Sequence, residues 1–109
     1  MGLMKIKKVT DEYIEFDNGD KITYDHERDC CETNYADFEQ IETFAYGLEF
    51  DEELIFEEVF GSGFRFGNLG KMFFIPCYSE QNGYYSSDVD IYYNDKHVLN
   101  VGCERHLFY

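Results

Sequence analysis

Short runs of alternating apolar and polar residues occupy much of the chain and predict strands. Residues 5–9, 13–16 and 21–24 each alternate in this way, and a period of two is typical of a strand with one buried face. Between the second and third runs lies the pair Asn18-Gly19, which readily takes the positive φ values of a tight hairpin turn. The N-terminal part of the chain therefore predicts an antiparallel three-stranded meander.

One segment has helical spacing instead. Asn34 is a favourable N-cap residue, and Gly47 is a favourable terminator. The apolar residues between and just beyond them recur at steps of three and four, which places them on one helix face; they are Phe38, Ile41, Ala45 and Leu48. This segment predicts one short helix.

The second half of the chain returns to strand patterns. Residues 53–60 and 61–67 predict two strands joined by a turn, and residues 72–75 predict a buried strand. Pro76 has no amide donor, so this last strand is expected at a sheet edge or at a bulge. Reversals are expected at Asn82-Gly83 and at Asn94-Asp95, on either side of a strand whose Val89, Ile91 and Tyr93 share a face.

Together these patterns predict an α+β fold that is mostly antiparallel β. We expect a twisted sheet or partly open barrel of about six to eight short strands with one short helix, forming a single domain over residues 1–109. Aromatic residues make up 19% of the chain, with 11 Phe and 10 Tyr. Large rings are therefore expected to fill the core.

The formal net charge of −14 is concentrated in the middle of the chain. Residues 11–60 carry 18 acidic side chains against Lys21 and Arg28, whereas residues 1–10 carry three Lys and no acid. Such a charge repels phosphate backbones and anionic lipid, so we expect neither direct nucleic-acid binding nor membrane binding. It attracts basic proteins. A solubilising surface without a specific partner is the alternative interpretation.

The sequence predicts a cytoplasmic protein. No stretch approaches the roughly 20 apolar residues of a membrane span, and the N-terminal residues lack the apolar run of a signal peptide. A framework of disulfides among the four cysteines would require secretion, so reduced thiols are expected.

The densest group of potential metal ligands is His26-x3-Cys30-Cys31. Cys103 and His106 could complete a four-ligand zinc site, with Cys77 as a spare thiolate. The alternative is that the cysteines are small buried apolar residues, since adjacent cysteines on an extended segment point in opposite directions. Zinc is therefore a hypothesis, and no other cofactor is predicted.

No catalytic constellation stands out. A cysteine nucleophile at Cys31 would be opposed by the neighbouring carboxylates, which disfavour a thiolate. The glycines from Gly61 to Gly70 match neither the dinucleotide fingerprint nor the P-loop. The sequence therefore predicts a protein that is not an enzyme and has no catalytic residues.

Two groups of residues are candidates for contact with a partner. Acidic side chains at Glu27, Asp29 and Glu32 lie in the densest part of the charged region, and Tyr84 and Tyr85 follow the Asn82-Gly83 turn. Tyrosine beside small hydroxyl residues is typical of binding loops. Paired tyrosines on a hairpin can also simply cover a sheet.

Two stretches carry a family resemblance: His26-x3-Cys30-Cys31-Glu32-x-Asn34-Tyr35-Ala36-Asp37-Phe38, and Pro76-Cys77-Tyr78-x3-Asn82-Gly83-Tyr84-Tyr85-Ser86-Ser87. They resemble a family of short, uncharacterised bacteriophage and bacterial proteins. The resemblance covers roughly residues 24–93 and implies a phage or mobile-element setting. It implies no activity and no catalytic residue.

The leading hypothesis is a non-enzymatic acidic binding protein that inhibits a host protein with a basic surface, for example a defence nuclease, by mimicking nucleic acid. One alternative is a small zinc-binding module built from the His and Cys residues. Another is a nucleotide sponge, in which the Tyr84-Tyr85 hairpin stacks on a base and Arg65, Lys71 or Arg105 holds the phosphate.

Overall fold

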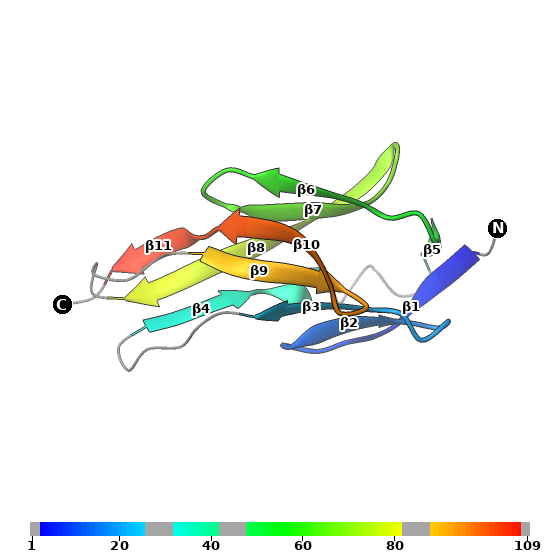
Figure 1. Cartoon of the computed structure of the whole chain (residues 1–109), viewed down its shortest axis with the longest axis horizontal. Helices are drawn as coiled ribbons and strands as arrows, with labels where there is room; N and C mark the ends of the chain where they lie inside the picture. Colours follow the sequence, from blue (N-terminus) through cyan, green and yellow to red (C-terminus); the bar gives the residue numbers. More distant parts are fainter. Residues whose placement is uncertain (1–2, 26–31, 42–47, 82–87, 108–109) are drawn as a thin grey trace.

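A computed structural model describes residues 3–25, 32–41, 48–81 and 88–107 (Figure 1), and within these it describes the side chains of residues 3–25, 35–41, 48–79 and 88–103. Two sheets contain all the strands of this part of the chain. Nearly every strand pair is antiparallel; the pairing of β11 (Glu104–Leu107) with β8 (Lys71–Gln81) is parallel.

The first sheet has six strands in the order β10-β9-β3-β2-β1-β5. Their bounds are β1 Leu3–Val9, β2 Tyr13–Phe16, β3 Lys21–Asp25, β5 Glu49–Asp51, β9 Asp88–Tyr93 and β10 Lys96–Gly102. Pairing of β1 with β2 and of β2 with β3 is antiparallel, so the predicted N-terminal meander is confirmed. A register shift between Ile6 and Lys8 in β1 increases the local twist.

The second sheet contains β6 (Ile55–Val59), β7 (Gly63–Asn68), β8 and β11 in the order β11-β8-β7-β6, and β4 (Glu32–Ala36) also pairs with β8. In Figure 1 the first sheet curls away from β10, which lies beside the second sheet, towards β2 and β1 on the opposite side. The architecture is thus a curled, half-barrel sheet facing another sheet.

Side chains join the two sheets at both of their edges. At one edge, the amide of Gly102 in β10 donates to Glu58 Oε2 of β6 at 3.0 Å. At the other edge, the amide of Asp51 in β5 donates to Asn68 Oδ1, at the end of β7, at 2.6 Å. Asn68 Nδ2 also donates to the carbonyl of Asp51 at 3.3 Å. Side-chain bonds therefore link the two sheets at both places.

Phenylalanine rings from both sheets fill the core, as the composition predicts. Phe50 of β5 is the central member of one ring cluster, with its ring centroid 5.9 Å from that of Phe16, 5.8 Å from Phe66 and 5.6 Å from Phe73. Phe16, Phe50 and Phe66 are completely buried. Rings at these distances, edge-on or tilted, pack favourably because positive ring edges meet negative ring faces.

Two of the three turns predicted at Asn-Gly or Asn-Asp pairs lie within the described residues, and they differ in type. Gly19 has a positive φ of 94°, whereas Asn18 does not, and the amide of Phe16 donates to Asp20 O at 2.8 Å. This is a three-residue loop, in which only the glycine needs the left-handed conformation. Asn94 and Asp95 both have positive φ, 51° and 68°, so the tight two-residue turn is the second one.

The predicted helix is wrong within the described residues. Asn34 lies inside strand β4 and is paired with Ser79, and only a 3-10 turn, η1 (Phe38–Ile41), follows. Phe38 and Ile41 are both buried, so one 3-10 turn places them both in the core. Residues 42–47, including Ala45 and Gly47, lie outside the described residues. The described chain therefore contains eleven strands and no α-helix.

Strand β8 runs straight through Pro76. The carbonyl of Pro76 accepts from the amide of Asp37 at 2.8 Å, and the amide of Cys77 donates to Ser62 O at 2.9 Å. Pro76 lies just beyond the last pair of the β4 ladder, Ala36 with Cys77. Its missing donor therefore falls where a ladder ends, which explains how proline is tolerated in a strand with partners.

The expected reversal at Asn82-Gly83 lies outside the described residues. The strand that follows, β9, pairs with β3 and β10, and no pairing of β9 with β8 is found among the described residues. Val89 and Ile91 are buried on one face of β9, as predicted. Across the described ranges, no helix has the length and apolar character needed to cross a bilayer.

Candidate functional site

Seven of the ten residues predicted to form a site lie outside the described part of the chain. Those that lie outside the described residues are His26, Glu27, Asp29, Cys30, Cys31, Tyr84 and Tyr85. Glu32 and His106 are described as backbone only. They lie on β4 and β11, which pair with opposite edges of β8 near its end.

Cys103 is the one predicted ligand whose side chain is described, and it lies in the core beside Cys77. The neighbouring residue Glu104 pairs with Tyr78, which places Cys103 next to Cys77 across the parallel ladder. Cys103 is 5% exposed, and Cys77 is completely buried. A hydrogen bond to Cys103, together with burial, raises the pKa of Cys77. Among the described side chains no group of three His, Cys, Asp or Glu could hold a metal ion.

Two of the three cations proposed to hold a phosphate, Arg65 and Lys71, already have partners, and the side chain of Arg105 lies outside the described residues. Arg65 forms an ion pair with Glu57, the neighbouring residue on β6. Lys71 Nζ donates to the carbonyl of Glu49 and lies 5.3 Å from the centroid of the Phe50 ring. Both side chains therefore stabilise contacts within the fold.

The outer face of strands β3, β9 and β10 carries a set of polar residues in register. In β9, Val89 and Ile91 are buried, so Asp88 and Asp90 project from the opposite, outer face. Asp90 pairs with Asp25 of β3 on one side and with Asn100 of β10 on the other. We call Asp25, Asp88 and Asp90 the carboxylate row.

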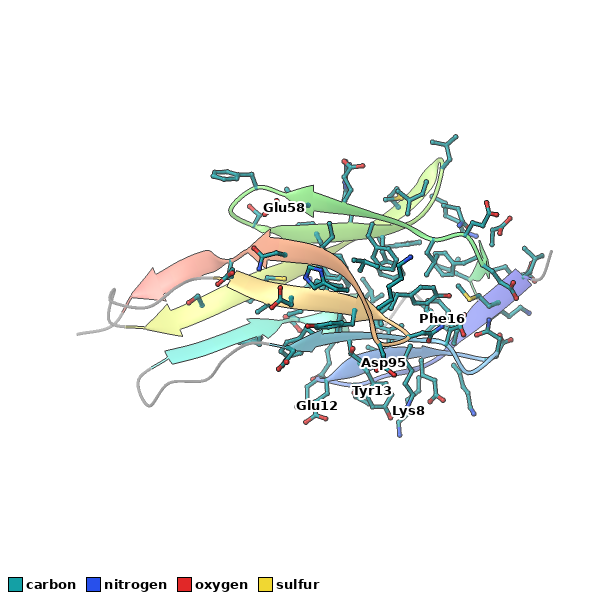
Figure 2. All side chains as sticks on the ribbon, in the orientation of Figure 1. Lys8, Glu12, Tyr13, Phe16, Glu58 and Asp95 are labelled. Carbon is teal, nitrogen blue, oxygen red and sulfur yellow. The ribbon has the colours of Figure 1, made fainter. Side chains whose placement is uncertain are left out.

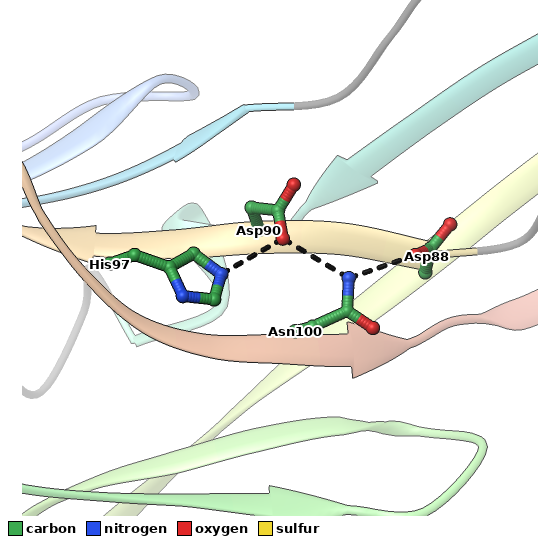
Figure 3. Close-up of polar contacts among 4 residues, drawn as sticks. All are labelled: Asp88, Asp90, His97 and Asn100. Atoms are coloured by element: carbon green, nitrogen blue, oxygen red, sulfur yellow. Dashed lines mark hydrogen bonds and ion pairs between the residues drawn. The ribbon is translucent and has the colours of Figure 1, made fainter.

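Hydrogen bonds hold two members of the carboxylate row in place (Figure 3). Asn100 Nδ2 donates to Asp88 Oδ2 at 2.8 Å and to Asp90 Oδ1 at 3.1 Å. The His97 ring nitrogen Nε2 lies 2.9 Å from Asp90 Oδ1. The His97 ring packs edge-on against Tyr92, with centroids 5.4 Å apart. Asp88 and Asp90 are thus acceptors with fixed orientations on an open sheet face.

A second row of side chains crosses the same outer face, two residues further along β9 than Asp90. Tyr13 pairs with Thr23, Thr23 with Tyr92, and Tyr92 with His97. We call these four residues the tyrosine row. Lys21 Nζ lies 4.8 Å and Lys8 Nζ 6.0 Å from the centroid of the Tyr13 ring, so positive charge gathers at one end of this row.

The described carboxylates do not gather on one face. Six acidic residues lie on β5, on β6 or between these two strands: Glu49, Asp51, Glu52, Glu53, Glu57 and Glu58. Glu49 forms an ion pair with Lys5 at 3.5 Å, and Glu57 forms one with Arg65. A polyanion-like face extending over the whole acidic region is therefore not found within the described residues, and the carboxylate row is the compact set.

The polar face that carries the carboxylate row was not among the predictions from the sequence, although the local sequence pattern indicates part of it. The alternation of Asp88, Val89, Asp90 and Ile91 by itself places both carboxylates on one polar face. The pairing with Asp25 depends on a contact between distant parts of the chain, which alternation does not reveal.

Comparison with known proteins gives no further guide to this site: no family model, no curated protein and no solved structure matches the chain. The fold and the two rows define a mostly antiparallel β protein with an open, polar sheet face.

Proposed function

We propose that this protein is a non-enzymatic acidic binding domain of phage or mobile-element origin, and that its partner is a host protein with a basic surface. The observation that supports this is the carboxylate row on the outer face of β3 and β9. Charge-assisted hydrogen bonds from lysine or arginine are the interactions that such acceptors favour.

The geometry of Asp90 suits an approaching donor. Both described contacts of this carboxylate, with His97 and with Asn100, are made by Oδ1. The second oxygen points away from them in Figure 3. A carboxylate whose orientation is already fixed loses less conformational entropy when a guanidinium binds it.

The spacing of the row favours a partner that normally holds nucleic acid. Residues two apart on a strand lie about 6.6 Å apart, and neighbouring strands are about 4.8 Å apart. Asp25, Asp88 and Asp90 thus present negative charge at short, regular intervals, as a phosphate backbone does. The net charge of −14 adds long-range attraction to a basic groove. A defence nuclease is the partner class that fits both this chemistry and the family resemblance.

The test is binding to, and inhibition of, a panel of purified nucleases with basic grooves. The variant Asp25→Asn/Asp88→Asn/Asp90→Asn is compared with Asp11→Asn/Glu12→Gln/Glu39→Gln, which removes the same charge from exposed residues elsewhere. We expect the first to weaken binding at least about tenfold and the second only about twofold, with affinity falling as salt rises.

Equal losses of affinity for the two variants would show that only net charge matters. They would contradict a specific role for the carboxylate row. Affinity that is indifferent to salt, or a failure of every nuclease to bind, would contradict the proposal as a whole.

A further inference from the structure

The tyrosine row has a short side chain between two long ones, and we call the space above the short one the slot. Thr23 on β3 lies between Tyr13 on β2 and Tyr92 on β9, each one strand away. Two strand spacings separate the backbones of the two tyrosines by about 9.6 Å. Because threonine is short and tyrosine is long, the middle of the row is lower than its sides. This distance leaves room for one flat ring above Thr23.

A cavity of about 300 Å³ lies at one end of this slot, lined by Gly19, Lys21, Thr23, Asn94 and Asp95. Its walls are the three-residue turn after β2 and the two-residue turn between β9 and β10. These turns are tied to each other: the amide of Lys21 donates to Asn94 Oδ1 at 2.9 Å, and the amide of Asn94 donates to Lys21 O at 3.0 Å. The cavity is therefore a fixed feature of two joined turns.

Positive charge lies beside the cavity in a protein that is otherwise strongly acidic. Lys21 lines it and lies against the Tyr13 ring, and Lys8 approaches the same ring. Figure 2 shows Lys8 and Tyr13 projecting from the same side of the molecule. Across the cavity, Asp95 supplies a carboxylate acceptor and Thr23 a hydroxyl group. One small molecule in the cavity can therefore contact a cation, an aromatic ring and a hydrogen-bond acceptor.

We propose that this cavity binds a nucleoside monophosphate. The base stacks beside Tyr92 above Thr23, the phosphate lies at Lys21 and Lys8, and Asp95 accepts hydrogen bonds from the ribose hydroxyls. Stacking of a base on an aromatic side chain tolerates any base, because every base has a π-face. The volume is at the lower end of the range for small-ligand sites, which limits the ligand to a single nucleotide. The site needs no protein partner and is independent of the binding role proposed above.

The first experiment is calorimetry at low salt with AMP, GMP, CMP and UMP, with the parent nucleosides and inorganic phosphate as separate arms. We expect each monophosphate to bind at least tenfold more tightly than its nucleoside and than phosphate. Chemical-shift changes in the unmodified protein should centre on Lys21, Thr23 and Asn94. No heat with any monophosphate, or a nucleoside or phosphate that binds equally well, would overturn the proposal.

Two variants then locate the site. Lys21→Met removes the charge, and Thr23→Tyr fills the slot while keeping a residue that favours strands. We expect each to weaken binding at least tenfold. Lys71→Met is the matched control, since Lys71 also lies over a ring, that of Phe50, but on the other side of the fold; it should change affinity less than twofold. Equal losses for Lys21→Met and Lys71→Met in folded proteins would contradict the assignment.

Discussion

The hydroxyl of Tyr93, at the end of β9, donates a 2.6 Å hydrogen bond to Asp20 Oδ2 in the turn before β3. This bond lowers the pKa of Asp20, although partial burial opposes the shift. Burial raises the pKa of Tyr93, and the bond to Asp20 adds to that effect. The pair thus fastens the β2–β3 hairpin to the end of β9.

Replacement of Tyr93 by Phe should destabilise the protein by about 1 kcal/mol at pH 7. Hydrogen bonds to charged groups contribute about 1.5–3 kcal/mol, and Asp20 is only partly buried, so water screens its charge. A lowered pKa means that Asp20 contributes stability above about pH 4, and that this contribution is lost as pH falls through its folded pKa. A raised pKa means that Tyr93 contributes below about pH 10, and that this contribution is lost as pH rises further.

The measurement is urea unfolding of Tyr93→Phe, Asp20→Asn and the double variant between pH 2 and pH 11. A double-mutant cycle isolates the coupling between the two side chains. The coupling should be constant from about pH 5 to pH 9 and smaller outside this window. A coupling that does not change at low pH would show that the Asp20 charge is not involved.

Replacement of Gly63 by Ala should destabilise the protein far more than replacement of Gly19 by Ala. A Cβ atom on Gly63 would lie 2.2 Å from the carbonyl oxygen of Ile75, whereas one on Gly19 would meet nothing within 4 Å. Both glycines have positive φ, so the Gly19 variant carries only the conformational strain of about 1–2 kcal/mol. The Gly63 variant adds a backbone clash, and we expect a loss of about 3 kcal/mol or more.

The free energies of unfolding of the two glycine variants, measured side by side, test this difference. Similar losses would mean that β7 and β8 do not approach each other as closely as the described register requires.

Truncation of the central member of the core ring cluster, Phe50→Ala, should cost about 3–5 kcal/mol, because it leaves a cavity between the two sheets. Phe60→Ala is the control. Phe60 is 94% exposed, whereas Phe50 is completely buried, so the control should change stability by no more than about 0.5 kcal/mol. Thermal unfolding of both variants measures the contrast, and a Phe50→Ala protein as stable as the control would place the core elsewhere.

The thiols of Cys77 and Cys103 should be inert in the folded protein. Their hydrogen bond and burial raise the pKa of Cys77 and so reduce its reactive thiolate at any given pH. In a Cys30→Ser/Cys31→Ser variant, a thiol-specific reagent at pH 8 should modify less than about a tenth of the remaining cysteines. Both should react after unfolding in guanidinium. Rapid modification of the folded variant would contradict the buried arrangement.

The parts of the fold that the sequence predicted depend on neighbours in the chain. The meander of β1 to β3 follows from alternating residues and one short turn at Gly19. Asn34 shows the limit of prediction from local sequence. It is a good N-cap residue, but it lies in a strand because it pairs with the edge of β8. Competition between local preference and a distant strand edge is decided by tertiary contacts, which single-sequence patterns do not contain.

The candidate site also has one part that the local sequence predicts and another part that depends on distant strands. Asp88 and Asp90 share a face for local reasons, whereas Asp25 and Thr23 reach β9 through pairing between strands far apart in sequence. The contact of His97 with Asp90 is made beside a register shift between His97 and Leu99 in β10. An irregularity of this kind leaves little trace in the composition of a strand.

The placement of β11 has a consequence for the order of assembly. Because β4 and β11 occupy the two edges of β8 at residues 78–81, one of these edges stays open until residues 104–107 have left the ribosome. An open edge is a template for any extended chain nearby. A nascent or truncated form without β11 is therefore the species most prone to join another copy, and aggregation during synthesis should depend on how quickly this last strand docks.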